Sequence, residues 1–445
     1  MQTTSLIPGV EIAVPAGDDV SVYDNSSAAP RLRRPDRQQT TWEPCCLDER
    51  LPRDHPARTI WKVVESLDLS AFYTPIAARG SDPGRAATEP KLLVALWLYA
   101  AVEGVGSGRE LDRLCREHDA YRWLCGGVSL NYHTLNDFRV AHGQALDDLF
   151  TKVLASLMCH DVVKVQRITQ DGTRVPASAG KSSFRRKPRI EDFLAQAKAH
   201  VEGLKKQADE AAEDSAQRLA AQQRAARERQ ERLEAALEEF AKIEATKAKQ
   251  REDKPSKHRE PRVSTTDPDA RVMKMGNGGF EPAYNVQIVA DTESRAILAI
   301  DVTNHGCDNG EDRPARQQVE QRTGQTPKEH LMDRGYLNIK GIEEASQEGV
   351  DIYVPLSPTA GNGRVCTEHK GDPPGVAAWR KRMTSEEGKK IYKLRGSTSE
   401  TVNADLKTFR GLQAFTVRGL AKVRCVALWS ALAYNVMHFA TVLTG

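Results

Sequence analysis

The feature that most constrains the fold is a run of about sixty residues, Ile190–Arg251, that consists mainly of Ala, Glu, Lys, Gln and Arg. It contains no proline and one glycine, Gly203, and this composition predicts long helix. The register slips near Asp214-Ser215, so we expect an antiparallel coiled-coil hairpin over residues 190–255 rather than one continuous helix. Its two seams are formed by Leu194, Ala197, Val201, Leu204 and Ala208, and by Leu219, Ala226, Leu233, Leu237 and Phe240.

The segments on either side of this run have the pattern of strands. Val162–Thr169 alternates apolar and polar residues before the run, and a hairpin, Tyr284–Ala290 with Ala296–Val302, follows it. Further on, two predicted helices alternate with two short apolar strands. The helices are Gln317–Thr323 and Ile339–Gln347, and the strands that follow them are His330–Met332 and Ile352–Pro355. The order predicts a mixed α/β sheet, antiparallel at first and parallel afterwards, which the helical run interrupts.

The region before the sheet, residues 54–160, is predicted to be all-α. Its helices are expected at 56–69, 89–102, 109–118, 119–124, from Ser129 or Asn131 to about His142, and at 147–160. The helix at 119–124, the turn Gly126-Gly127 and the next helix, bearing Tyr132 and Arg139, resemble a helix-turn-helix that binds DNA. The alternative is an ordinary helical bundle. Residues 1–53 lack periodicity and are expected to form an extended arm.

Charge and cysteine usage limit the compartment and the partners. The net charge is only +3, so a nucleic-acid partner has to be inferred from local clustering; Arg380–Arg424 holds twelve Lys or Arg against four Asp or Glu. Eight scattered cysteines without a C-x-x-C pair predict neither a zinc site nor a disulfide framework. With no signal peptide, and with Cys425–Leu443 taken as an amphipathic core helix, we expect a cytoplasmic protein without a membrane partner.

Three acids stand where such a sheet could bring them together. Asp171 is expected to end the first strand, Asp333 the fourth, and Glu400 lies on a predicted helix, Tyr392–Lys407. Carboxylates are the ligands that Mg²⁺ prefers, and two ions can clamp both oxygens of a phosphoryl displacement. Two alternatives stay open. Ser397-x-x-Glu400 fits a helix capping box, and Asp291 and Asp301 compete with Asp333 as strand-end acids.

On one face of the predicted Tyr392–Lys407 helix lie Glu400, Asn403 and Lys407. On the other face Val402, Leu406 and Phe409 are expected to pack against a core. The segment would thus present polar groups on a helix that is anchored from behind.

Over residues 42–445 the ordered motifs resemble DDE transposases of bacterial insertion sequences. The motifs are the helical region, Asp171-Gly-Thr, Asp267-Pro-Asp-Ala-Arg271, Asp333-x-Gly335-Tyr336 and Tyr392-x-x-Arg395…Glu400-x6-Lys407. The resemblance implies an RNase H-like catalytic domain, residues 161–189 and 262–445, with Asp171, Asp333 and Glu400 as the metal-binding triad. It also implies that Tyr392, Arg395 and Lys407 contact the backbone of the element end. Four residues separate Arg395 from Glu400, whereas the commonest form of the signature has three.

The function that follows is cleavage of element ends with Mg²⁺, two ions for which Mn²⁺ can substitute, and strand transfer into target DNA. The expected partners are double-stranded DNA, as terminal inverted repeats and target, and a second copy in a homodimer on DNA. The alternatives are a metal-dependent nuclease without strand transfer and a catalytically inactive DNA-binding protein.

Overall fold

The computed structural model describes residues 46–77, 86–209, 216–253, 260–356 and 370–445. The description below concerns the compact unit Leu47–Gly445. Most of the predicted arm, the predicted turn at Asp214-Ser215 and the side chain of Ala208 lie outside the described residues.

The helical region has the predicted helices, with shifts of up to four residues at their ends, and one short helix, α2, that was not predicted. They are α1 (Pro56–Ser66), α2 (Ser70–Tyr73), α3 (Pro90–Val102), α4 (Gly108–Glu117), α5 (Asp119–Cys125), α6 (Tyr132–Ala141) and α7 (Gly143–Cys159). Local sequence sets several of the starts. Ser107 accepts a hydrogen bond from the Glu110 amide at the start of α4, and Asn131 caps α6 by accepting from the Thr134 amide.

The first strand differs from the prediction. Strand β1 spans Arg167–Pro176, so Asp171 and Gly172 lie in its middle rather than after its end. Val163 and Val165, which suggested an earlier strand, are buried in the core outside it. Val165 has a positive φ of 52°, which is incompatible with a strand. The spacing of these two valines reflects their burial in the core and not a strand. The observed strand instead carries the polar residues of the site.

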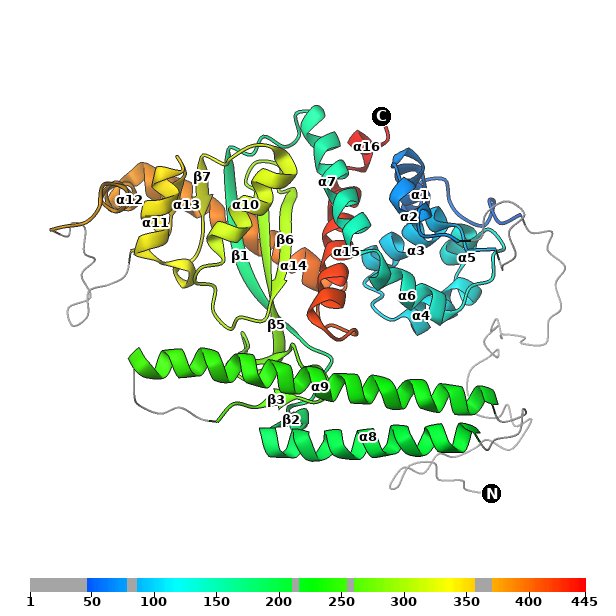
Figure 1. Cartoon of the computed structure of the whole chain (residues 1–445). Coiled ribbons are helices and arrows are strands. Elements are labelled where there is room, and N and C mark those ends of the chain that lie inside the picture. Colours follow the sequence, from blue (N-terminus) through cyan, green and yellow to red (C-terminus); the bar gives the residue numbers. More distant parts are fainter. Residues whose placement is uncertain (1–45, 78–85, 210–215, 254–259, 357–369) are drawn as a thin grey trace, which may run out of the picture. The chain divides into compact units, whose positions relative to one another are not determined.

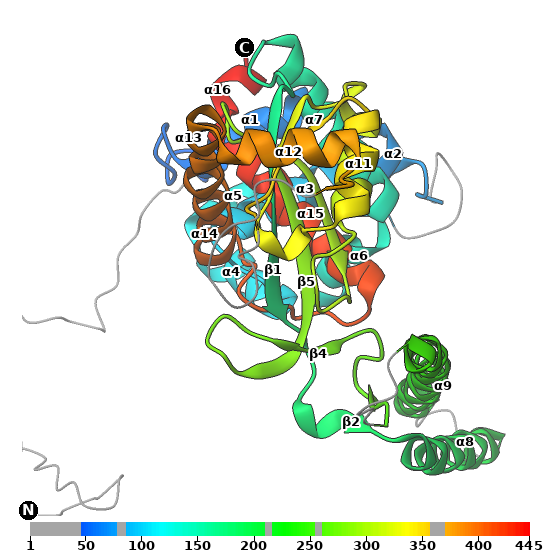
Figure 2. The same ribbon diagram turned by 90° about the vertical axis from the view of Figure 1, so that its left-hand side faces the viewer.

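The sheet is mixed, as predicted. β5 (Phe280–Asp291) and β6 (Ile297–Thr303) form the hairpin, and β1 pairs with β5 in antiparallel register. β7 (Glu329–Leu331) pairs in parallel with β1, and β8 (Asp351–Tyr353) pairs in parallel with β7. The spatial order is therefore β6-β5-β1-β7-β8, and the long strands β1 and β5 run side by side (Figure 2).

Several elements near the sheet were predicted incompletely or not at all. α10 (Asp312–Thr323) begins five residues earlier than expected, whereas α11 (Ile339–Gln347) has the predicted bounds. Neither β4 (Arg271–Lys274), which pairs with the start of β5, nor α12 (Pro374–Thr384) was predicted. β4 has four residues, two of them exposed, so a local pattern marks it weakly.

The long charged run forms two helices, α8 (Lys187–Asp209) and α9 (Ala216–Asp253), which lie side by side (Figure 1). They are antiparallel, because Lys198 pairs with Glu234 and the Gln223 amide donates to the Leu204 carbonyl. A single continuous helix is thereby excluded, whereas coiled-coil supercoiling stays a prediction. At the base of the hairpin β2 (Phe184–Arg185) pairs with β3 (Val263–Ser264).

The last helices follow the sheet. They are α13 (Glu386–Arg395), a π-helical segment (Gly396–Glu400), α14 (Thr401–Thr408), α15 (Leu420–His438) and α16 (Ala440–Leu443). α15 lies between β6 and the helices α3 and α7 (Figure 1). Residues 425–436 of this helix are buried on all sides rather than amphipathic as expected, since Ser430 and Asn435 are 2% and 0% exposed. Asn435 instead satisfies its amide by bonding both the N–H and the C=O of Ile297 on β6.

One hydrophobic core joins helices α1–α7, the strands β1, β5 and β6, and α15, whereas β7 and β8 belong to a second apolar cluster. The helical region therefore shares its core with the sheet, and the proposed boundary between them at residue 160 stays a prediction. Within the described ranges no helix is long and apolar enough to cross a bilayer.

Candidate active site

Asp171 lies on β1 with its side chain only 19% exposed. Its two oxygens have different partners. Oδ1 accepts from Arg395 Nη2 at 3.1 Å, and Oδ2 accepts from Asn403 Nδ2 at 2.7 Å. Both donors come from the α13–α14 segment, so this segment packs its polar face against the middle of β1.

Asp333 is brought to the same place by the parallel pairing of β1 and β7. Thr169 is in register with Leu331, and Asp171 and Asp333 each follow two residues later. Asp333 caps the turn Arg334–Tyr336 by accepting from the Gly335 amide at 2.7 Å. Its Oδ2 lies 3.9 Å from the same Arg395 nitrogen that contacts Asp171. Two acids 162 positions apart thus converge on one cation.

The competing acids are engaged elsewhere. Asp291 closes the β5–β6 turn by accepting from the Ser294 amide and hydroxyl. Asp301 forms an ion pair with Arg424 at 2.8 Å. Of the strand-end acids considered from the sequence, the structure brings Asp333 to Asp171.

Glu400 ends the π-helical segment and is exposed. A π-turn bonds residue i to i+5 rather than i+4, so it absorbs one extra residue. This accounts for the four residues, rather than three, between Arg395 and Glu400. The capping-box alternative does not hold, because the Ser397 hydroxyl donates to the Leu394 carbonyl and the helix runs on through this point.

The third acid is not in contact with the other two. In the part of the chain that the structure describes, Glu400 makes no hydrogen bond or ion pair, and no three His, Cys, Asp or Glu side chains are grouped closely enough to hold a metal ion. On the opposite face Val402 and Leu406 are buried as expected. Phe409 is 58% exposed, contrary to expectation, because α14 ends at Thr408 and Phe409 lies beyond it.

The electrostatics of the site favour cation binding. Burial raises the pKa of Asp171; Arg395 opposes this shift, while the negative charges of Asp333 and Asp308 add to it. An uncompensated cluster of this kind gains stability when a cation binds. Burial also lowers the pKa of Lys407, with Asp171 opposing the shift and Arg174 adding to it.

The donor set suits a hard divalent cation. Two carboxylates face one another across Arg395. Beside them the Asn403 Oδ1 atom is shielded from solvent and has no hydrogen-bond partner among the described residues. Carboxylate and amide oxygens are the ligands that Mg²⁺ takes in proteins. The residues present therefore fit such an ion.

Asp308 is a residue of this region that sequence reasoning missed. It lies after β6, is 6% exposed, and forms an ion pair with Arg174 at 3.0 Å. Its neighbours, Cys307-Asp308-Asn309-Gly310, have the composition of an ordinary turn. Nothing local in the sequence distinguishes it from other loop acids.

The DNA-contact candidates from the helical region differ in position. Tyr132 is half-buried at the start of α6, and the Arg109 guanidinium lies 5.1 Å from its ring centre. Arg139 is 7% exposed, stacks on Trp97 and donates to the Gly106 carbonyl at 2.6 Å. Its guanidinium is thus enclosed inside the protein, and this position does not support the expectation that Arg139 binds DNA.

The candidates from the C-terminal signature are closer to the acids. Tyr392 is half-buried against the cluster that contains Trp379, and burial raises its pKa. Lys407 is partly buried near Asp171. Arg395 contacts both Asp171 and Asp333 in this structure, so its guanidinium is engaged with the two acids.

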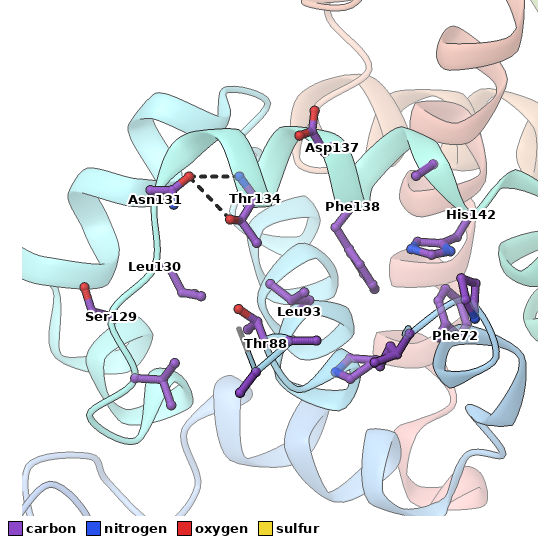
Figure 3. Close-up of a pocket in the computed structure, with 17 residues that line it drawn as sticks. Phe72, Thr88, Leu93, Ser129, Leu130, Asn131, Thr134, Asp137, Phe138 and His142 are labelled. Atoms are coloured by element: carbon purple, nitrogen blue, oxygen red, sulfur yellow. Dashed lines mark hydrogen bonds between the residues drawn. The ribbon is translucent and has the colours of Figure 1, made fainter. Parts of the chain in front are cut away.

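A cavity of about 780 Å³ lies between α2, the start of α3 and α6 (Figure 3). Phe72, Leu93, Phe138 and His142 line it, and its polar groups Asn131 and Thr134 bond to one another. The cavity is separate from the acid pair and is not a candidate active site.

Two family models match the chain. Residues 45–141 match a transposase domain (DUF772), which covers the helical region from α1 to α6. Residues 242–436 match a transposase DDE domain, which contains Asp333, Arg395 and Glu400. No curated protein and no solved structure matches the chain significantly. With both models matching in chain order and with the acid pair on the sheet, the chain belongs to the DDE transposases of insertion sequences.

Proposed function

We propose that this transposase cleaves the ends of its own element and joins them to target DNA by metal-dependent phosphoryl transfer. The observation that carries the proposal is the convergence of Asp171 and Asp333 on Arg395 within a chain whose DDE domain matches the family. The strand order β6-β5-β1-β7-β8 supports an RNase H-like sheet for this domain.

Asp171, Asp333 and Glu400 would hold two Mg²⁺ ions, or Mn²⁺ in their place. When bound, these ions would stabilise the charge that develops on the attacking and leaving oxygens of the phosphodiester. Glu400 would complete the set by a change of its exposed side chain, because the π-helical segment carries it on the same stretch of chain as Arg395 and Asn403.

The protein's own side chains would prepare the site. Asn403 fixes the orientation of the Asp171 carboxylate through its 2.7 Å hydrogen bond. Arg395 offsets the repulsion between Asp171 and Asp333 while no metal is bound. Once ions neutralise these acids, the guanidinium becomes available for a DNA phosphate, which fits its expected role at the element end.

DNA would be held by the basic stretch Arg380–Arg424 together with the exposed face of α6. The position of Tyr132 supports a DNA contact there, whereas that of Arg139 supports a structural role. A homodimer on DNA and a cytoplasmic location complete the proposal. The dimer would bring both element ends together.

The test is cleavage of a labelled element-end duplex with Mg²⁺, followed by a strand-transfer assay with target DNA. The wild type should cut and join, and Asp171→Asn and Asp333→Asn should do neither while keeping their affinity for DNA. Cutting without joining would establish a nuclease instead. DNA binding without cutting by the wild type would establish an inactive DNA-binding protein.

A second measurement separates the DNA contacts. Lys407→Ala should weaken binding to all DNA sequences. It should also lower the slope of log affinity against log salt concentration by about one, because binding releases fewer counterions when one phosphate contact is lost. Tyr132→Ala should affect end-specific binding. Arg139→Ala should lower the melting temperature, and a variant that keeps its melting temperature but loses end-specific binding would restore Arg139 as a DNA contact.

A further inference from the structure

The buried carboxylate of Asp308 has its hydrogen-bonding capacity largely filled by the protein. Its Oδ1 accepts from Asn285 Nδ2 at 2.7 Å and from Gln287 Nε2 at 2.9 Å. Its Oδ2 accepts from Arg174 Nη2 at 3.0 Å. Two of these donors are on β5 and the third is on β1, so the loop after β6 is fixed to the two central strands.

Both acid motifs carry a glycine that faces this carboxylate. A Cβ atom on Gly172, next to Asp171, would lie 2.2 Å from Asp308 Oδ1. A Cβ atom on Gly335, two residues after Asp333, would lie 3.4 Å from Asp308 Oδ2. Neither glycine has a positive φ. At Gly172 the close approach of Asp308 leaves no room for a side chain, whereas at Gly335 the nearest atom is Asp333 Oδ1, at 2.9 Å, and Asp308 is a packing neighbour. The Asp308 carboxylate thus lies between the two acid-bearing segments.

Gln287 extends the same connection. Its Oε1 accepts from the Tyr336 hydroxyl at 2.5 Å and from Gln170 Nε2 at 2.8 Å. Tyr336 belongs to the turn that Asp333 caps, and Gln170 precedes Asp171 on β1. Through Gln287, Asp308 is therefore linked to both segments by hydrogen bonds as well as by contact.

We propose that Asp308 is a positioning residue of the active site, which holds the Asp171 strand and the Asp333 turn at the separation that a divalent cation requires. It acts through these segments and is not itself a metal ligand, because three protein donors already occupy its oxygens. Side chains that orient the ligands of a metal commonly affect its affinity as strongly as 10- to 100-fold. This inference rests on the proposed metal-dependent function.

The first experiment measures binding of Mn²⁺ alone to the full-length protein by titration calorimetry, without DNA. Asp308→Asn should weaken Mn²⁺ affinity by about 10- to 100-fold. The matched control is Asp291→Asn, since Asp291 is also buried (2% exposed) but closes a turn away from the site. The control should lower the melting temperature without changing Mn²⁺ affinity, which separates positioning from a general loss of stability.

Two further variants keep the test decisive if Asp308→Asn folds poorly. Tyr336→Phe removes only the hydroxyl that bonds Gln287, and should weaken Mn²⁺ affinity in the same direction by a smaller factor. Gly172→Ala should displace the Asp308 carboxylate and weaken Mn²⁺ affinity. In an Asp308→Ala background the same change should have a smaller further effect, because the closest contact, with Asp308, is gone while the contact with Gln287 Nε2, at 2.7 Å, is left.

These measurements distinguish a failure of the positioning role from a failure of the proposed function. Wild-type Mn²⁺ affinity in Asp308→Asn and Tyr336→Phe, or fully additive effects of Gly172→Ala and Asp308→Ala, would overturn the positioning role. If the wild type itself bound no Mn²⁺ and cut no DNA with Mg²⁺, the proposed function would fail instead.

Discussion

Asn403 donates a 2.7 Å hydrogen bond to Asp171 across 232 positions of sequence. The bond joins a helix near the end of the chain to the first strand of the sheet, and Arg395 makes a second contact to the same carboxylate. Asp171, the first of the three acids in the sequence, is therefore oriented by two residues near the C-terminal end of the chain, Arg395 and Asn403.

Replacing Asn403 by Ala should slow strand cleavage by about 10- to 100-fold, because a partner that orients a ligand is lost. DNA affinity should change little, since the basic surface remains. Asn304→Ala is a suitable control, because Asn304 also bonds one acceptor, the Asp269 carbonyl, but lies outside the acid pair. Equal cleavage rates in the Asn403 and Asn304 variants would show that orientation of Asp171 does not limit the reaction.

Deleting Ser397 should convert the π-helical segment into continuous α-helix. The segment accommodates one extra residue, and Ser397 is exposed, whereas Thr398 and Ser399 are buried. The faces of α13 and α14 should stay in register, so cleavage should remain within about tenfold of wild type. Inserting one alanine after Ser397 should rotate α14 by about 100° relative to α13 and abolish cleavage. Loss of activity in the deletion alone would mean that the π-turn itself is required.

His330 should make stability fall as the pH decreases. It is fully buried on β7, neither ring nitrogen has a partner among the described residues, and burial beside Arg316 lowers its pKa well below 6.5. Below pH 6.5 the unfolded chain takes up a proton that the folded protein does not, so the unfolding free energy should drop by about 1.4 kcal/mol per pH unit from this group. Urea unfolding at pH 5.5 and 7.5 measures the drop.

The control for this prediction is His330→Leu, which should lose that part of the pH dependence and remain as stable as wild type at neutral pH. An unchanged pH dependence in His330→Leu would assign the effect to other groups.

Replacing residues 187–260 by a short Gly-Ser linker should leave the catalytic core folded. Arg185 and Val263 are paired neighbours in the small sheet, so the linker spans a short gap. The hairpin buries its own apolar cluster, which includes Ala197, Leu233 and Phe240. Circular dichroism should show a loss of helix, and the melting transition of the remainder should persist. A deletion variant that has no cooperative transition would show that the hairpin is part of the core.

The sequence by itself determined the elements whose signals are local. Long helical composition predicted α8 and α9, and Asn131 was one of the two predicted starts of the helix that the structure shows as α6. The alternation around Asp291 predicted the β5–β6 hairpin, because a turn and two facing strands are encoded within twenty residues. Glycine-flanked acids after apolar runs indicated Asp171 and Asp333, although the bounds of β1 were wrong.

Only the tertiary structure decided which groups meet. The choice of Asp333 over Asp291 depends on the parallel register of β1 and β7, which no local pattern specifies. Arg139 was a candidate for DNA binding from the sequence, but Trp97 on α3 and Gly106 in the loop after α3 enclose its guanidinium. The link between Asp308 and the acid pair was recognised only from the position of its carboxylate between Gly172 and Gly335. The physical reason is common to all three: burial and hydrogen bonding depend on neighbours far along the chain, whereas helix and turn propensities depend on residues a few positions away.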